Sequence, residues 1–193
     1  GSSAASDVYK RQKLYSEIAI IWKTDELKRT KPSPLDEAKW GLAVIEDSLW
    51  DTIPKVYKRL NDIFRKNLNK DLPRNFNPIQ FGSWMGGDRD GNPNVTSEVT
   101  KKVILFSRWQ AAKLYEKELT QLIQDLSMEE CSPAISRVTG KSFEPYRVYL
   151  RPLRDKVRNT HQLIEAHINF NKPLDEKKLL QDKYEIIDPL REV

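Results

Sequence analysis

Apolar residues recur at helical spacing through long stretches of this chain, and the pattern predicts a mainly α-helical fold. The longest stripe runs from Leu35 to Phe64, where Pro54 is expected to kink or divide the helix. Further stripes predict helices over about 13–29, 96–127 and 145–170, a short helix over 133–140 and a last helix over 174–184. No internal repeat of the kind found in solenoids is visible.

Helix starts are marked by capping residues and prolines. Ser33 precedes Pro34, and Ser132 precedes Pro133, which places an N-cap hydroxyl before a proline at the first helical position. Thr96 or Ser97 can cap the next helix, Pro145 opens another, and Gly140 suits a helix end.

One short strand is expected at about 79–83, where Ile79, Gln80 and Phe81 precede Gly82. A single strand leaves its backbone donors and acceptors unpaired, so its neighbours are expected to lie outside this sequence. The predicted fold class is therefore mainly α, a helical fragment with one short strand.

Composition narrows the class of protein. Hydrophobic residues make up 38% and charged residues 32% of the 193 residues, which is typical of a soluble globular chain. The mean hydropathy of −0.67 is polar for a self-sufficient domain. The single cysteine, Cys131, excludes an internal disulfide, and no apolar run approaches a membrane span, so we expect a cytoplasmic protein with no membrane partner.

The net charge of +5 makes nucleic acid the first partner to consider. However, the basic residues alternate with acidic ones along the helical faces, for example over 116–118, and do not form a block. No nucleic-acid partner is expected.

Residues 1–12 are small and polar, and we interpret them as a disordered tail or a segment left over from cloning or gene assembly. Residues 13–193 are interpreted as a single helical fragment.

The segment from Phe81 to Thr96 is the main candidate for a functional site. It contains four of the seven glycines of the chain, and Gly86, Gly87 and Gly91 bracket an Asp-Arg-Asp triplet. Glycines allow positive φ angles and close backbone approach, so the triplet is expected to have a defined geometry.

A calcium loop does not fit this segment. In an EF-hand register starting at Asp88, glycine falls at the fourth position instead of the sixth, and Val99 replaces the terminal glutamate. Phosphate-loop and dinucleotide fingerprints are also missing. His161 and His167 are six residues apart, which does not place them on one helical face, so no metal site is predicted.

An anion site remains as the functional interpretation. The guanidinium of Arg89, oriented by Asp88 and Asp90, suits a carboxylate, phosphate or bicarbonate. Trp84 and Met85 would form an apolar wall that excludes water. The alternative, a purely structural turn that holds an Arg–Asp pair, stays open at this point.

The string GSWMGGDRDGNPNVT, residues 82–96, resembles a signature of the phosphoenolpyruvate carboxylase family. Other segments resemble the same family in the same order, and the resemblance covers nearly everything from Lys13 onward; these segments are 24–29 with Pro32 and Pro34, 46–50 with Ile53 and Pro54, 126–128, 144–147 and 153–156.

The resemblance implies a mostly helical enzyme built around an α/β barrel, usually a homotetramer, that uses Mg²⁺ or Mn²⁺. Such an enzyme joins bicarbonate to phosphoenolpyruvate to give oxaloacetate and phosphate. It implies catalytic roles for Arg89 and Trp84, with substrate-binding or loop positions at Met85, Gly86, Gly87, Asp88, Asp90, Gly91 and Asn92. Asp88 and Asp90 would fix the arginine, and Asn92 would hold the loop closed.

Several family motifs are missing from this sequence. An essential histidine in an FTAHPT-type motif is expected before this segment, and further arginines, a second histidine and the acidic metal ligands are expected after Val193. We therefore interpret the chain as an internal fragment that is inactive alone. The alternative is a non-catalytic helical binding or regulatory module that keeps an anion-binding loop.

Lys28 and Arg29 occupy the positions of a sugar-phosphate activator site in plant members of the family. A lysine in place of the usual first arginine would weaken a bidentate phosphate contact, so these residues are only a possible allosteric site.

Overall fold

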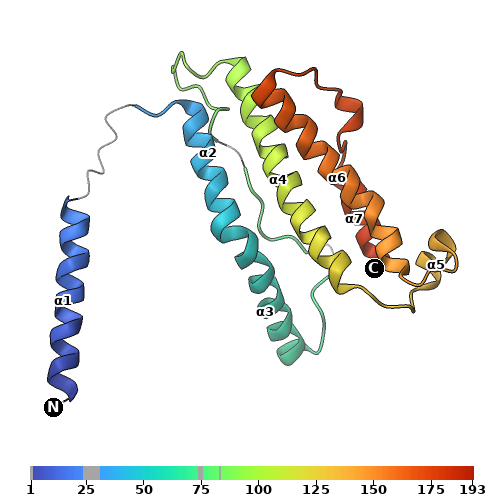
Figure 1. The fold of residues 1–193 in the computed structure, drawn as a ribbon, viewed down its shortest axis with the longest axis horizontal. Coiled ribbons are helices and arrows are strands. Elements are labelled where there is room, and N and C mark those ends of the chain that lie inside the picture. The colour runs from blue at the N-terminus through green and yellow to red at the C-terminus, as the bar shows by residue number, and fades with distance from the viewer. Residues whose placement is uncertain (1, 24–30, 74–75, 83) are drawn as a thin grey trace. The chain divides into compact units, whose positions relative to one another are not determined.

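The computed structural model describes residues 2–23, 31–73, 76–82 and 84–193. The chain divides into two compact units, Gly1–Pro32 and Ser33–Val193. The first unit contains helix α1 (Ser2–Lys23), and the second contains the helices from α2 onward (Figure 1). The predicted mainly α fold is confirmed. Because α1 begins at Ser2, residues 2–12 are helical and not the disordered tail that the sequence suggested.

Helix α2 (Pro34–Val44) starts where the sequence predicted. Ser33 and Asp36 form a capping box, in which the Ser33 hydroxyl accepts from the Asp36 backbone N–H and the Asp36 carboxylate accepts from the Ser33 backbone N–H. Pro34 occupies the first turn, where its missing N–H costs nothing. This end of α2 lies beside the glycine-rich loop.

The helical path over the stripe from Leu35 to Phe64 is continuous, so the helix is not divided at Pro54. A π-helical turn, η1 (Ile45–Leu49), joins α2 to α3 (Trp50–Leu68), and Pro54 lies within the first turns of α3. Pro54 lacks an N–H and its ring crowds the carbonyl of Trp50, and the wider turn directly before it accommodates this irregularity. No residue of α3 is fully buried.

Three other predicted helix starts are confirmed, whereas the helix expected from about Lys13 begins earlier, at Ser2. Thr96 caps α4 (Ser97–Asp125), Ser132 caps α5 (Pro133–Thr139), which ends at Gly140, and α6 (Pro145–Phe170) begins at a proline. Helices α4 and α6 lie side by side, and α2 also contacts α4 (Figure 1).

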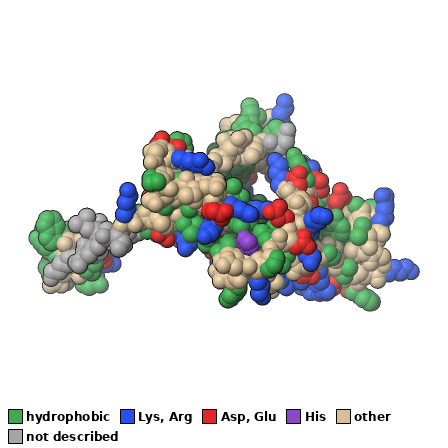
Figure 2. Space-filling model, turned by 90° about the horizontal axis from the view of Figure 1, so that it is seen from above, with side chains coloured by type: hydrophobic (Ala, Val, Ile, Leu, Met, Phe, Trp, Pro, Cys, Tyr) green, Lys and Arg blue, Asp and Glu red, His purple; other side chains and the backbone are tan. Residues whose placement is uncertain are grey.

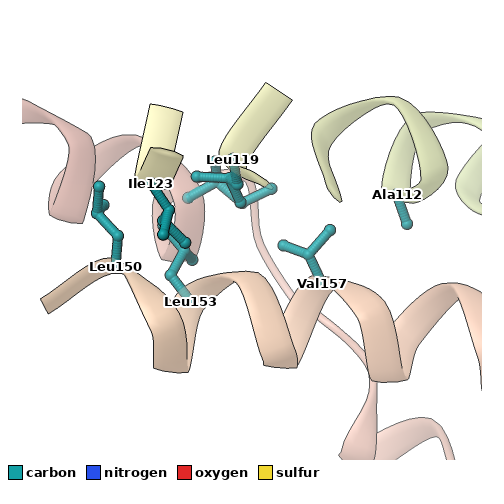
Figure 3. Packing of buried hydrophobic residues seen from close by; sticks show 7 residues of the cluster. Ala112, Leu119, Ile123, Leu150, Leu153 and Val157 are labelled. Carbon is teal, nitrogen blue, oxygen red and sulfur yellow. The ribbon is translucent and has the colours of Figure 1, made fainter. Parts of the chain in front are cut away.

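The main core lies between α4 and α6. In Figure 3 the buried side chains of one helix point toward those of the other, and Leu150 and Val157 are completely buried; the labelled members are Ala112, Leu119, Ile123, Leu150, Leu153 and Val157. Arg158 of α6 pairs with Glu116 of α4 at 2.5 Å at the edge of this core. This packing makes α4 a rigid support for the loop that precedes it.

The prediction of a last helix over residues 174–184 is wrong. A short 3₁₀ turn, η2 (Glu176–Lys178), is followed by an irregular stretch and then by α7 (Tyr184–Arg191). Leu179 is completely buried with Leu105 and Ile164, and the Leu180 N–H donates to Thr160 Oγ1. These tertiary contacts outweigh the local helix propensity.

The predicted strand at 79–83 is also wrong over its described residues, 79–82, which have no regular structure; Ser83 lies outside the described residues. A strand needs a partner, and none of the described segments pairs with this one. The adjacent residues contact α3 instead, since Tyr57 donates to Asn77 and stacks edge-on with Phe76.

Surface charges are mixed. On the face shown in Figure 2, the Lys and Arg side chains lie among Asp and Glu side chains. None of the described helices has the length and apolar character needed to cross a membrane.

Candidate functional site

Two tight turns shape the segment from Trp84 to Val95. In the first turn the Trp84 carbonyl accepts from the N–H groups of Gly87 and Asp88, both at 3.2 Å. In the second turn the Arg89 carbonyl accepts from the Asn92 N–H, and the two central residues, Asp90 and Gly91, have φ angles of 37° and 72°. Two positive φ angles in succession favour an Asp-Gly or Asn-Gly pair, which explains this dipeptide.

Asn92 is the centre of the second turn. Its side-chain oxygen accepts from the Asn94 N–H at 3.0 Å, and its carbonyl accepts from the Val95 N–H at 3.1 Å. Val95 is buried and anchors the end of the loop. These bonds stabilise the second turn, while the role of Asn92 in holding the loop closed stays a prediction.

The loop is fixed to two helices by close contacts. Thr100 of α4 donates its hydroxyl proton to the Gly86 carbonyl at 2.7 Å. Gly86 is buried with φ of 71°, and a Cβ atom there would lie 2.6 Å from Cγ2 of Val103. On the other side, Met85 packs directly on Gly41 of α2, where a Cβ would overlap the methionine methyl group. Thus both helices determine the position of the loop.

Gly86→Ala should lower the free energy of unfolding by about 2–4 kcal/mol, because the alanine adds backbone strain and a clash with Val103. Gly91→Ala is the matched control, since Gly91 has almost the same φ but no atom lies within 4 Å of the place that a Cβ would take, and it should cost about 1–2 kcal/mol. Urea unfolding measures both values. Equal losses would show that the contact with Val103 is unimportant.

The predicted side chains surround a cavity of about 150 Å³. Trp84 is 73% exposed, Asp88 is half-buried, and Arg89 and Asp90 are exposed. Pro34 and Glu37 from the start of α2, together with Val95, complete the lining. The structure therefore brings together seven of the predicted residues, namely Trp84, Met85, Gly86, Asp88, Arg89, Asp90 and Asn92. Gly87 and Gly91 do not line the cavity and instead form the turns.

The predicted pairing of Arg89 with its neighbours is not seen. Among the ion pairs between described residues, none includes Arg89, Asp88 or Asp90. The guanidinium can therefore donate to an external acceptor.

The charge around this cavity is unfavourable for an anion. Its lining contains one cation, Arg89, and three carboxylates, Glu37, Asp88 and Asp90, so the formal charge of the lining side chains is −2. A small anion held here needs cations from outside the described residues, because the carboxylates repel it. This argues against a self-sufficient anion receptor.

Other predicted residues lie elsewhere. Lys28 and Arg29 are outside the described residues. His161 lies 2.8 Å from Glu116, whereas Nδ1 of His167 lies 2.8 Å from the Lys172 carbonyl. In the described part of the chain, no cluster of three or more His, Cys, Asp or Glu residues is arranged to hold a metal ion.

Sequence reasoning missed the residues that support the loop. Gly41, Thr100 and Val103 make the contacts that fix Met85 and Gly86. A glycine within an apolar helical stripe is the signal that could have identified Gly41, because such a glycine often marks close approach by another segment.

Comparisons with known proteins agree on one family. The family model described as "Phosphoenolpyruvate carboxylase" matches residues 3–193, which includes most of the first dozen residues. Curated relatives with this name include proteins from Enterobacter sp. (44% identical over 181 residues), Acinetobacter baylyi (43% over 174 residues) and Pseudomonas paraeruginosa (41% over 181 residues). These matches cover 93%, 90% and 94% of this chain but only 20%, 19% and 20% of those proteins. The chain spans about a fifth of the length of the relatives that it matches.

Proposed function

Because the chain belongs to the phosphoenolpyruvate carboxylase family, we propose that it is a section of an enzyme that joins bicarbonate to phosphoenolpyruvate to give oxaloacetate and phosphate. In this proposal the loop from Trp84 to Asn92 forms part of the active-site wall. The complete enzyme is expected to be a cytoplasmic homotetramer. The section alone is expected to be inactive.

The charge of the loop cavity is the observation that carries this proposal. Arg89 is exposed and makes no ion pair with a described residue, yet it shares the cavity with three carboxylates. Such a lining suits one wall of a larger site in which other cations balance the carboxylates. It does not suit the alternative of a non-catalytic module that binds anions by itself.

Each loop residue has a role that follows from its chemistry. In the reaction, a bicarbonate oxygen attacks the phosphorus of phosphoenolpyruvate, and carboxyphosphate and the pyruvate enolate are formed. Carboxyphosphate then breaks down to phosphate and carbon dioxide. The guanidinium of Arg89 would donate two parallel hydrogen bonds to an anionic oxygen pair and stabilise its charge. The indole of Trp84, with Met85, would keep water away while the enolate reacts with carbon dioxide.

The family uses a divalent metal ion, which would stabilise anionic oxygens of the substrate. The described residues do not fit this ion, since they contain no suitable group of ligands. We therefore place the metal ligands in the rest of the polypeptide and assign no step of the metal chemistry to this chain.

A segment exchange tests the proposal. The 193-residue chain should give no oxaloacetate with phosphoenolpyruvate, bicarbonate and Mg²⁺ in an assay coupled to malate dehydrogenase. When its residues replace the matched 181-residue segment of the Enterobacter relative, the resulting full-length chimera should form oxaloacetate. Robust turnover by the isolated chain, or a folded chimera without activity, would contradict the proposal.

A further inference from the structure

A second hollow, which Arg89 also lines, follows the first three turns of α4. Its volume is about 340 Å³, and Arg89, Lys101 and Arg108 are its cationic lining residues. Ser97, Thr100, Ile104, Leu105 and Glu176 complete the lining. We call this hollow the α4 groove.

The α4 groove differs from the loop cavity in the sign of its charge. Three cations face one carboxylate, that of Glu176, so the formal charge of the lining side chains is +2, against −2 in the loop cavity. The groove is also more than twice as large. Within the described part of the chain, an anion is therefore attracted to the groove and repelled from the loop cavity.

The three cations have unused hydrogen-bonding capacity. The side chains of Lys101 and Arg89 are exposed and make no hydrogen bond or ion pair with a described residue. Arg108 is half-buried and donates through Nη2 to the Leu180 carbonyl at 2.7 Å, which fixes its guanidinium and leaves its other N–H groups available. By contrast, Lys156 on α6 is already paired with Glu185.

The spacing of the cations suits one elongated ligand. Lys101 and Arg108 are seven residues apart on α4, which places their Cα atoms about 10 Å apart along the helix axis and on one face. The hydroxyl of Ser97 lies in the first turn of α4, where the helix dipole also favours negative charge. Arginine forks with a hydroxyl donor are typical of phosphate recognition.

We propose that the α4 groove binds a small phosphate-bearing anion through Arg89, Lys101 and Arg108. Arg89 also lines the loop cavity, and its single guanidinium cannot serve both sites at once. A phosphate bound in the groove therefore competes for Arg89 with any anion that the loop cavity holds. The binding step itself does not depend on the proposed carboxylase activity.

The test is a titration of the 193-residue chain with inorganic pyrophosphate at low ionic strength. Calorimetry and backbone NMR shifts measure the binding. We expect saturable binding with shifts concentrated on residues 97–108 and on Arg89. Lys101→Gln and Arg108→Gln should each weaken binding by about five- to tenfold, because each removes a charge-assisted hydrogen bond. Succinate should bind much more weakly than pyrophosphate.

Lys102→Gln is the matched control. Lys102 is the next residue on α4, is exposed, and does not line the groove, so its substitution changes the net charge equally and should alter binding less than about twofold. Circular dichroism checks that each variant is folded. The proposal would be overturned by equal effects of K101Q and K102Q, or by an effect of Arg89→Gln without one of Lys101→Gln. It would also be overturned if succinate bound as tightly as pyrophosphate, or if no saturable binding were seen.

Discussion

Arg89→Gln is expected to lower the kcat for oxaloacetate formation by about 100- to 1000-fold in the full-length chimera described above. A loss of this size follows when one preorganised donor to a developing anionic oxygen is removed. Glutamine keeps a polar side chain of moderate length but has neither the charge nor the two-pronged donor geometry of arginine. The measurement is the steady-state rate with saturating phosphoenolpyruvate and bicarbonate.

Arg137→Gln provides the control for this prediction. Arg137 is exposed on α5 and lines none of the cavities described above, so its substitution should change kcat less than about twofold. A kcat for the Arg89→Gln chimera close to that of the parent would exclude Arg89 from a catalytic role. In that case the loop would be a structural turn.

The second large effect is expected in the core that supports the loop. Leu150→Ala should lower the free energy of unfolding of the isolated chain by about 2–5 kcal/mol, because Leu150 is completely buried between α4 and α6. The cost combines the lost burial of the side chain with the cavity that it leaves. Urea unfolding, followed by far-ultraviolet circular dichroism, measures the change.

Val148→Ala is the control on the same helix. Val148 lies two residues before Leu150 but is 41% exposed, so its substitution should cost less than about 1 kcal/mol. Similar losses for the two variants would mean that α6 does not pack on α4 as described. The loop would then lack the rigid support that Thr100 and Val103 provide.

The helix starts could be predicted from sequence because they depend on local chemistry. The hydroxyl of Ser33 and the ring of Pro34 act within a single turn, so this pair of adjacent residues was sufficient. The C-terminal helix could not be predicted in the same way. There the buried position of Leu179 and the hydrogen bond from the Leu180 N–H to Thr160 override the local preference.

In the candidate site, the turns of the backbone could be predicted from the sequence, but the side-chain contacts could not. The glycines correctly indicated tight turns, because Gly86 and Gly91 adopt positive φ angles. The contacts of Arg89 could not be deduced, since side-chain pairing depends on where the two turns direct their residues. The α4 groove was missed for the same reason, because Arg89 and Arg108 come from separate segments and Lys101 reads in sequence only as part of a solvated helix face.

Chemical protection of Arg89 tests most directly whether this loop lines the active site. Phenylglyoxal modifies accessible guanidinium groups, and mass spectrometry of the modified chimera measures the extent of reaction at each arginine. Without Mg²⁺, so that no turnover occurs, phosphoenolpyruvate should protect Arg89 strongly while Arg137 reacts as before. The Lys101→Gln form of the chimera, in which anion binding by the α4 groove is weakened, should show the same protection of Arg89. Equal modification of Arg89 with and without phosphoenolpyruvate would contradict the placement of this loop at the active site.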